Sequence, residues 1–240
     1  MNKNNNIRDL IYISGNEINH NCFYSYGIEF HEFMSCISEK PELLILLKHK
    51  FDDALLNLHS RFEYVTSNEL KDLINDDVYG YGDFCWIDMK TADELDHMSK
   101  QHIAELLYFG HLAEPLHRLP MARFAYYAHD DGWFNKLYVT DIEDYECLLW
   151  KVLLLKLTKL TRRSFVDIPP NLSMVLLEFT KEGLFIDLSK IKKSRNEVAI
   201  PITAIGHYRD MDKVYDLRDE IEEYKLYLVY SQKSWRMEVK

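Results

Sequence analysis

Alternation of apolar and polar residues along the chain predicts a series of antiparallel strand pairs. Trp235–Lys240 alternates in this way, as the last arm of a hairpin. Phe124–His129 and Trp133–Val139 are predicted to be hairpin arms because Asp131-Gly132 between them suits the positive φ of a tight turn. A further strand is expected over Phe84–Met89, which is apolar almost throughout. The hairpins that the pattern predicts cover residues 124–139, 174–188 and 225–240.

The region between residues 43 and 65 allows two interpretations. Leu56–Tyr64 alternates like a half-buried strand, whereas Leu43–Leu47 is a continuous apolar run. A run this short fits either a buried strand or a helix that begins after Pro41. The sequence alone leaves open whether residues 43–65 form a helix or a hairpin.

Helices are predicted where a threonine is followed three residues later by a glutamate. In such a capping box the hydroxyl accepts from the N3 amide, and the carboxylate reaches back to the amide of the cap residue. The boxes at Thr66, Thr91 and Thr140 predict helices over about 66–76, 92–109 and 141–160. The third is apolar nearly all round, which is typical of a buried central helix. A fourth helix is expected over 209–224, with acidic residues crowding the side opposite its apolar stripe.

Hairpins that alternate with single helices predict an α+β fold. We expect a mainly antiparallel sheet built from hairpins and covered by helices, with the apolar helix at about 141–160 in the centre. Pro169-Pro170 marks a joint, because proline disfavours a helical residue before it. It divides a main lobe, 1–168, from a C-terminal hairpin–helix–hairpin lobe, 169–240, and both are expected to pack as one globular unit.

The charge balance bears on the class of partner. The 240 residues carry a formal net charge of −10, although basic clusters follow the central helix and occupy 190–195. A protein that binds nucleic acid needs a local excess of Lys and Arg to displace counterions, so the acidic total lowers that expectation. An acidic surface suits a basic partner, and we expect that partner to be another protein.

Cysteine spacing and hydrophobic runs bear on the compartment. None of the four cysteines forms a C-x-x-C pair, which argues against a zinc ribbon or a redox motif. The strongest apolar run, Leu148–Leu157, is short and interrupted by Lys151 and Lys156, whereas a membrane helix needs about 20 apolar residues. The first residues carry no apolar stretch. We therefore expect a cytoplasmic protein that does not enter a membrane.

A group of histidines and acids between residues 102 and 131 is the candidate for catalysis. The possible metal ligands are His102, Glu105, His111 and His129, and the possible catalytic bases are Asp130 and Asp131. Imidazoles with a carboxylate suit a catalytic zinc or iron ion that keeps one position open for water. Their spacing matches no established metal motif. A metal-dependent hydrolase is therefore the alternative function. For the main function, that of a non-catalytic binding protein, no cofactor is expected.

Aromatic side chains favour a different function. The chain contains 16 tyrosines, and the hairpin over 124–139 carries Tyr127, Trp133 and Phe134. Aromatic side chains of this kind anchor protein interfaces. Together with the acidic charge, they favour a non-catalytic acidic binding or regulatory protein: a regulator, an immunity-type protein or a defence-associated partner.

Three stretches carry a resemblance to a known group of proteins. They are Tyr79–Asp88 (YGYGDFCWID), Glu105–His111 (ELLYFGH) and Ala128–Lys136 (AHDDGWFNK). With these, the sequence resembles an uncharacterised family of small soluble bacterial proteins that has no established activity. The resemblance covers most of the chain and implies a bacterial, cytoplasmic origin, but it implies no substrate, cofactor or catalytic residue.

Overall fold

The computed structural model describes residues 9–15, 21–48, 63–75, 84–89, 91, 93, 97, 99, 122–129 and 134–240. The strands are β1 (Leu10–Gly15), β2 (Cys22–Tyr26), β3 (Leu43–Lys48), β4 (Glu63–Thr66), β5 (Phe84–Met89), β6 (Ala122–His129), β7 (Phe134–Val139), β8 (Leu184–Asp187), β9 (Lys192–Lys193), β10 (Glu197–Ala204), β11 (Leu226–Ser231) and β12 (Ser234–Val239). They form one twelve-stranded sheet in the order β12-β11-β10-β8-β1-β2-β7-β6-β5-β3-β4, with β9 paired to β10. Every neighbouring pair is antiparallel.

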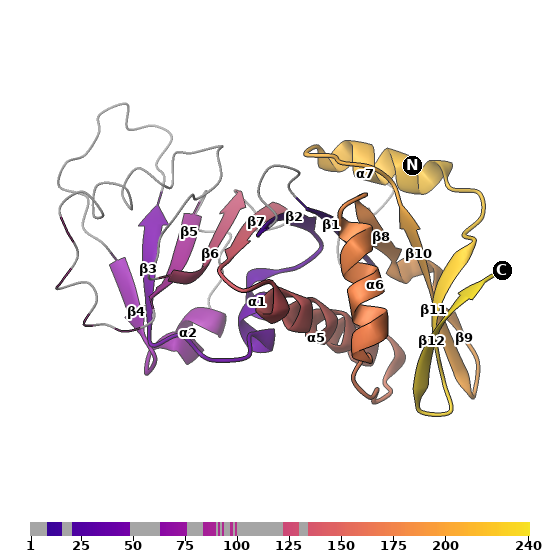
Figure 1. Cartoon of the computed structure of the whole chain (residues 1–240), viewed down its shortest axis with the longest axis horizontal. Coiled ribbons are helices and arrows are strands. Elements are labelled where there is room, and N and C mark those ends of the chain that lie inside the picture. The colour runs from indigo at the N-terminus through magenta and orange to yellow at the C-terminus, as the bar shows by residue number, and fades with distance from the viewer. Residues whose placement is uncertain are drawn as a thin grey trace.

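Five α-helices accompany this sheet in the described residues. They are α1 (Phe30–Cys36), α2 (Leu70–Asn75), α5 (Ile142–Thr161), α6 (Pro170–Thr180) and α7 (Met211–Glu220), with a 3-10 turn at Leu188–Lys190. In Figure 1 the strands follow one another along the long axis of the molecule, from β4 at one end to β11 and β12 at the other. The α+β fold and the mainly antiparallel sheet expected from the sequence are confirmed.

Alternating side chains of the strands build a separate core on each face of the sheet. In β1, Ile11 and Ile13 pack with residues of α1, α5 and α6, and we call this the helix face. Leu10 and Tyr12 point the other way and pack with Val214 of α7, so we call that side the α7 face. Because both faces are covered, a strand such as β1 is apolar at four successive positions, Leu10–Ile13, rather than alternating with polar residues.

The predicted central helix is present as α5 and lies on the helix face. Leu149, Val152 and Leu153 are fully buried there. Its start differs by one residue from the prediction, since Asp141 rather than Thr140 caps it and accepts from the amide of Glu143 at 2.9 Å. Asp is as good a cap as Thr, and either oxygen satisfies an amide of the first turn.

The open question over residues 43–65 is answered in favour of strands for the part that the structure describes. Leu43–Lys48 forms β3, which pairs with β4 on one side and with β5 on the other. Residues 49–62, which hold most of the strand expected over Leu56–Tyr64, lie outside the described residues. A short apolar run is a strand here because both of its faces are covered.

The hairpins expected over 124–139 and 225–240 are confirmed as β6–β7 and β11–β12, and the helix over 209–224 as the shorter α7. The hairpin expected over 174–188 is wrong in its first arm. Pro170–Thr180 is helix α6, not a strand. The turn at Glu182-Gly183 therefore joins a helix to strand β8, instead of joining two strands. Pro170 occupies the first helical position, where its fixed φ favours a helix start.

The helix predicted over 92–109 lies outside the described residues, apart from single positions. None of the described helices has the length and hydrophobicity that crossing a membrane requires.

Candidate functional site

Most of the residues proposed for metal-dependent catalysis fall outside the described part of the chain. This applies to His102, Glu105, His111, Asp130 and Asp131. His129 is the last residue of β6, where it pairs with Phe134, but its side chain is not described. Among the described residues, no three His, Cys, Asp or Glu side chains lie close enough to hold a metal ion. The hydrolase alternative stays a prediction.

Two of the three proposed interface residues are described, and both are half-buried on the α7 face. Tyr127 and Phe134 pack against the core cluster that contains Tyr24, Cys85 and Tyr138. Trp133 lies outside the described residues. The aromatic part of this hairpin is therefore continuous with the core of the sheet, and its role in binding remains a prediction.

The strand register places a row of polar and aromatic side chains across the centre of the α7 face. Ser14 pairs with Tyr24, Tyr24 with Lys136, Lys136 with Tyr127, and Tyr127 with Cys85. Burial raises the pKa of the Cys85 thiol to about 12, which keeps the thiol neutral at physiological pH. The row thus crosses five strands. Its side chains include one ammonium group, that of Lys136, and no carboxylate.

Two cations gather at the Tyr24 ring within this row. Lys136 Nζ lies 5.5 Å from the ring centroid and the Arg209 guanidinium 5.0 Å from it, both within reach of a cation–π contact. Lys136 is only 6% exposed, and its Nζ also lies 5.6 Å from the Tyr138 ring. The sequence held a signal for this lysine, because alternation from Phe134 to Tyr138 puts it on an otherwise aromatic side of the strand.

A hydrogen-bond network fixes the loop before α7 onto β1. The Tyr12 hydroxyl donates to the Gly206 carbonyl and accepts from the Tyr208 amide, each at 2.7 Å. Ser14 Oγ lies 2.5 Å from His207 Nδ1. Ser14 is 3% exposed, so its hydroxyl holds the loop in place rather than facing a substrate. Burial raises the pKa of Tyr12, and the hydrogen bond from the Tyr208 amide opposes that rise.

A cavity with an acidic lining lies where α7 ends and β11 begins. Its volume is about 620 Å³, within the range of roughly 300–1,000 Å³ that is usual for ligand pockets. The lining residues are Phe179, Ile202, Thr203, Ala204, Glu220, Ile221, Glu222, Glu223, Lys225 and Leu226. We call this cavity the acidic groove, because apolar side chains of α6, β10 and β11 lie beside three exposed glutamates.

The acidic groove adjoins a segment that is rich in carboxylates. Residues 209–225 contain seven acidic and four basic side chains, so this segment contributes −3 to the total of −10. Asp210 caps α7 through its side chain, which accepts from the Asp212 amide at 3.0 Å. Asp216 and Asp219 are exposed on α7. The field around the groove therefore favours a cation.

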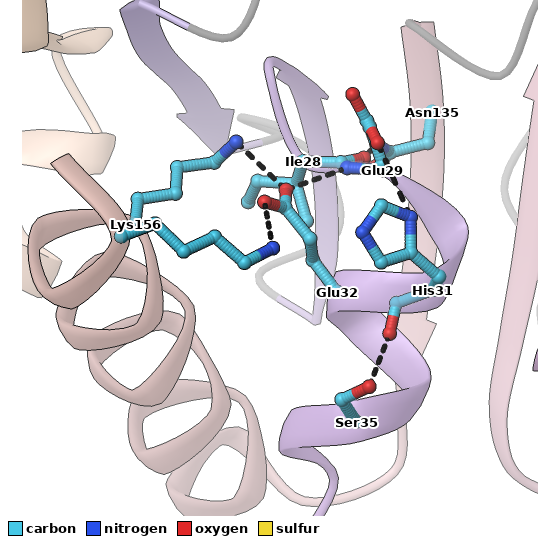
Figure 2. A network of polar contacts seen from close by, with 8 residues as sticks. Ile28, Glu29, His31, Glu32, Ser35, Asn135 and Lys156 are labelled. Carbon is cyan, nitrogen blue, oxygen red and sulfur yellow. Dashed lines mark hydrogen bonds and ion pairs between the residues drawn. The ribbon is translucent and has the colours of Figure 1, made fainter.

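A second polar cluster, on the helix face, has a structural role. Glu32 Oε2 lies 2.7 Å from Lys156 Nζ, and the two side chains are 5% and 4% exposed (Figure 2). The same oxygen accepts from the Glu29 amide at 3.2 Å, which closes the capping box of α1. Asn135 of β7 donates to the Ile28 carbonyl at 2.9 Å. These bonds join α1, α5 and β7, and they pair the buried charges with each other.

Comparison with known proteins adds no relative. No protein family, no curated protein and no solved structure matches this chain. The resemblance noted in the sequence therefore carries no argument about the site. The function has to be argued from the acidic groove and from the charges that surround it.

Proposed function

We propose that this protein is a non-catalytic acidic binding or regulatory protein, and that its acidic groove receives a basic segment of a partner protein. A regulator, an immunity-type protein or a defence-associated partner would each use such a surface. The observation that carries the proposal is the pairing of an apolar lining with a glutamate rim in a cavity of about 620 Å³.

The groove offers both kinds of contact that a basic peptide needs. Phe179, Ile221 and Leu226 are half-buried and provide apolar surface for aliphatic side chains or for the methylene stem of a lysine. Glu220, Glu222 and Glu223 stand beside them in solvent, where each ion pair contributes about 0.2–1 kcal/mol. Specificity in this arrangement depends on both contributions acting together.

The overall charge supports the same class of partner. At −10 the protein attracts a basic protein over longer distances and speeds the encounter at low salt. An acidic patch without the groove would act in the same way on any cation. The test therefore has to separate the groove from the net charge.

The first experiment measures binding of a fluorescently labelled peptide that alternates lysine and leucine, by anisotropy at low and at physiological salt. The groove variant carries Glu220→Gln, Glu222→Gln and Glu223→Gln together. Three carboxylates at the ion-pair energies given above amount to about 1–3 kcal/mol, so we expect binding to weaken about 10-fold.

The matched control carries Glu42→Gln, Glu143→Gln and Asp167→Asn, three exposed acids outside residues 209–225 that do not line the groove. Both triple variants change the net charge from −10 to −7, since each substitution removes one negative charge. We expect the control to weaken binding by less than about 3-fold. Equal losses in both variants, or no binding of the peptide at low salt, would overturn the groove proposal.

Metal analysis separates this function from the hydrolase alternative. We expect protein purified without an affinity tag to contain no stoichiometric zinc, iron or manganese, and its melting temperature to be the same with and without chelator. A stoichiometric metal with a chelator-sensitive melt would refute the non-catalytic assignment and direct attention to His102 and His129.

A further inference from the structure

The end strand β12 exposes a row of backbone groups at the edge of the sheet. β12 pairs with β11 through a two-residue turn in which Gln232 and Lys233 have positive φ. Ser231 and Ser234 flank the turn, and the Lys240 amide donates to the Lys225 carbonyl at 2.8 Å. In an antiparallel pair the bonded residues alternate, so the even-numbered residues of β12 bond to β11. The N–H and C=O groups of the odd-numbered residues face an edge that no other described strand occupies.

The side chains of β12 divide by the same alternation. Trp235 is buried, and its ring packs on Phe165 and Tyr230, with ring centroids 5.6 and 4.8 Å away. Met237 is half-buried, whereas Val239 on the same side is 82% exposed. Arg236 and Glu238 point to the opposite side of the strand, so β12 presents an apolar and a charged side along one unpaired edge.

We infer that β12 pairs with β12 of a second copy of this chain, antiparallel and about a two-fold axis at Met237. In that register the backbone N–H and C=O groups of Met237 form hydrogen bonds with those of Met237 of the second copy. The backbone groups of Trp235 and Val239 form hydrogen bonds with each other across the axis. Arg236 then lies opposite Glu238 of the second copy in both directions. Each strand donates three N–H groups, and the exposed Val239 gains an apolar neighbour in Trp235.

The charges of β12 select this register over its neighbours. A shift of two residues in one direction places Arg236 opposite Arg236, and the same shift in the other direction places Glu238 opposite Glu238. Like charges directly opposite each other destabilise a strand pair, whereas unlike charges contribute roughly 0.2–1 kcal/mol. A two-fold interface must be self-complementary, and the arrangement Trp-Arg-Met-Glu-Val is self-complementary about its central residue.

The expected dimer is weak and depends on concentration. One strand pair of this length buries less than the roughly 1,200 Å² of a stable interface. Exposed Val166, whose carbonyl accepts from Trp235 Nε1 at 2.8 Å, adds apolar surface next to the strand. We therefore expect monomer and dimer to exchange in the micromolar range, as sedimentation equilibrium would measure.

Site-directed cross-linking tests the axis directly. In a Cys147→Ser background, which removes the exposed cysteine of the described residues, Met237→Cys should form an interchain disulfide under mild oxidation. Opposed Cα atoms in a bonded pair lie about 5.5 Å apart, within the usual range for a disulfide. Ser234→Cys is the matched control, because it is more exposed but lies about 20 Å from its symmetry mate at about 3.4 Å per residue. Equal cross-linking of both variants, or none of Met237→Cys, would overturn the inference.

A charge-swap series tests the register without touching Met237. Arg236→Glu and Glu238→Arg should each weaken the dimer about 5-fold or more, because each places like charges opposite each other twice. The double variant restores unlike pairs, so it should return to within about 3-fold of the wild-type dissociation constant. Arg236 also pairs with Glu238 at 2.6 Å and with Glu197 at 3.1 Å within its own chain, so melting temperatures of all three variants control for the loss of these bonds. A wild-type protein that stays monomeric at millimolar concentration, or a double variant that is not rescued, would refute the two-fold pairing.

Discussion

Replacing Lys156 by methionine tests whether the buried charge cluster on the helix face holds α1 and α5 together. Lys156 Nζ lies 2.7 Å from Glu32 Oε2, and both side chains are almost completely buried. Methionine fills nearly the same volume but leaves the carboxylate of Glu32 without this partner. Two weaker contacts remain, the Glu29 amide at 3.2 Å and the Nζ of Lys159, which is 55% exposed and lies 3.8 Å from Glu32 Oε1.

The size of the effect follows from what the cluster loses. Removing one partner of a buried ion pair destabilises a protein by about 3–5 kcal/mol, since an uncompensated charge remains in the interior. The Lys159 ammonium offsets part of this, so we expect a loss of about 3 kcal/mol in the free energy of unfolding for Lys156→Met. For a chain of this size that is about 6–12 °C in melting temperature, at about 2–4 °C per kcal/mol.

Urea unfolding at pH 7 measures this loss against two further variants. Lys181→Met removes an exposed pair with Glu178, whose side chains are 61% and 65% exposed, and should cost less than about 1 kcal/mol. Glu32→Gln combined with Lys156→Met removes both charges and should recover much of the stability that the single variant loses. If Lys156→Met is as stable as Lys181→Met, or the double variant is no better than the single one, the buried pair does not have the role assigned to it.

Three smaller predictions concern cysteines and glycines. At pH 8, Cys147 should be alkylated quickly and buried Cys36 and Cys85 slowly, as intact-mass spectrometry of the native protein would show. Burial raises the pKa of the Cys36 thiol to about 11, so the unfolded state loses this proton first, and the free energy of unfolding should fall as pH rises from about 9 towards 11. Gly183→Ala should cost about 2 kcal/mol or more in chemical unfolding, because φ is +76° and a Cβ would meet the Gly206 carbonyl at 1.8 Å; Gly15→Ala, whose Cβ meets nothing closer than 3.6 Å, should cost less than about 1 kcal/mol.

The fold was predictable from the sequence where two local signals agreed. Apolar runs on either side of the turn signal Asp131-Gly132 located β6–β7, alternation over residues 235–240 located β11–β12, and a capping residue with an apolar run located α5. At Met174–Leu177 the run Met-Val-Leu-Leu is too short to distinguish a helix from a strand by its period, and the structure has it in α6. Pro169-Pro170, which the sequence marks as a joint, lies where α6 begins, and Pro170 is the first residue of that helix. Proline stops a helix before it but favours one after it, and only the second effect applied here.

The candidate site was less predictable because its residues come from distant segments. The acidic crowding of residues 209–224 was visible in the sequence, but its neighbours Phe179 and Ile202 belong to α6 and β10. No local sequence pattern predicts that these segments meet at the start of β11. They meet because β11, β10 and β8 are neighbours in the sheet, and strand order is a tertiary property.

The acidic groove and the edge of β12 lie on neighbouring strands, and this relates the two proposals. Leu226 lines the groove and pairs with Val239, so the groove adjoins the C-terminal end of β12. In an antiparallel dimer about Met237 the two grooves lie at opposite ends of the paired strands. A partner with two basic segments would then bind both grooves at once and gain avidity from the second contact. A weak dimer suits such a role, because the bivalent partner would itself stabilise the pairing that it needs.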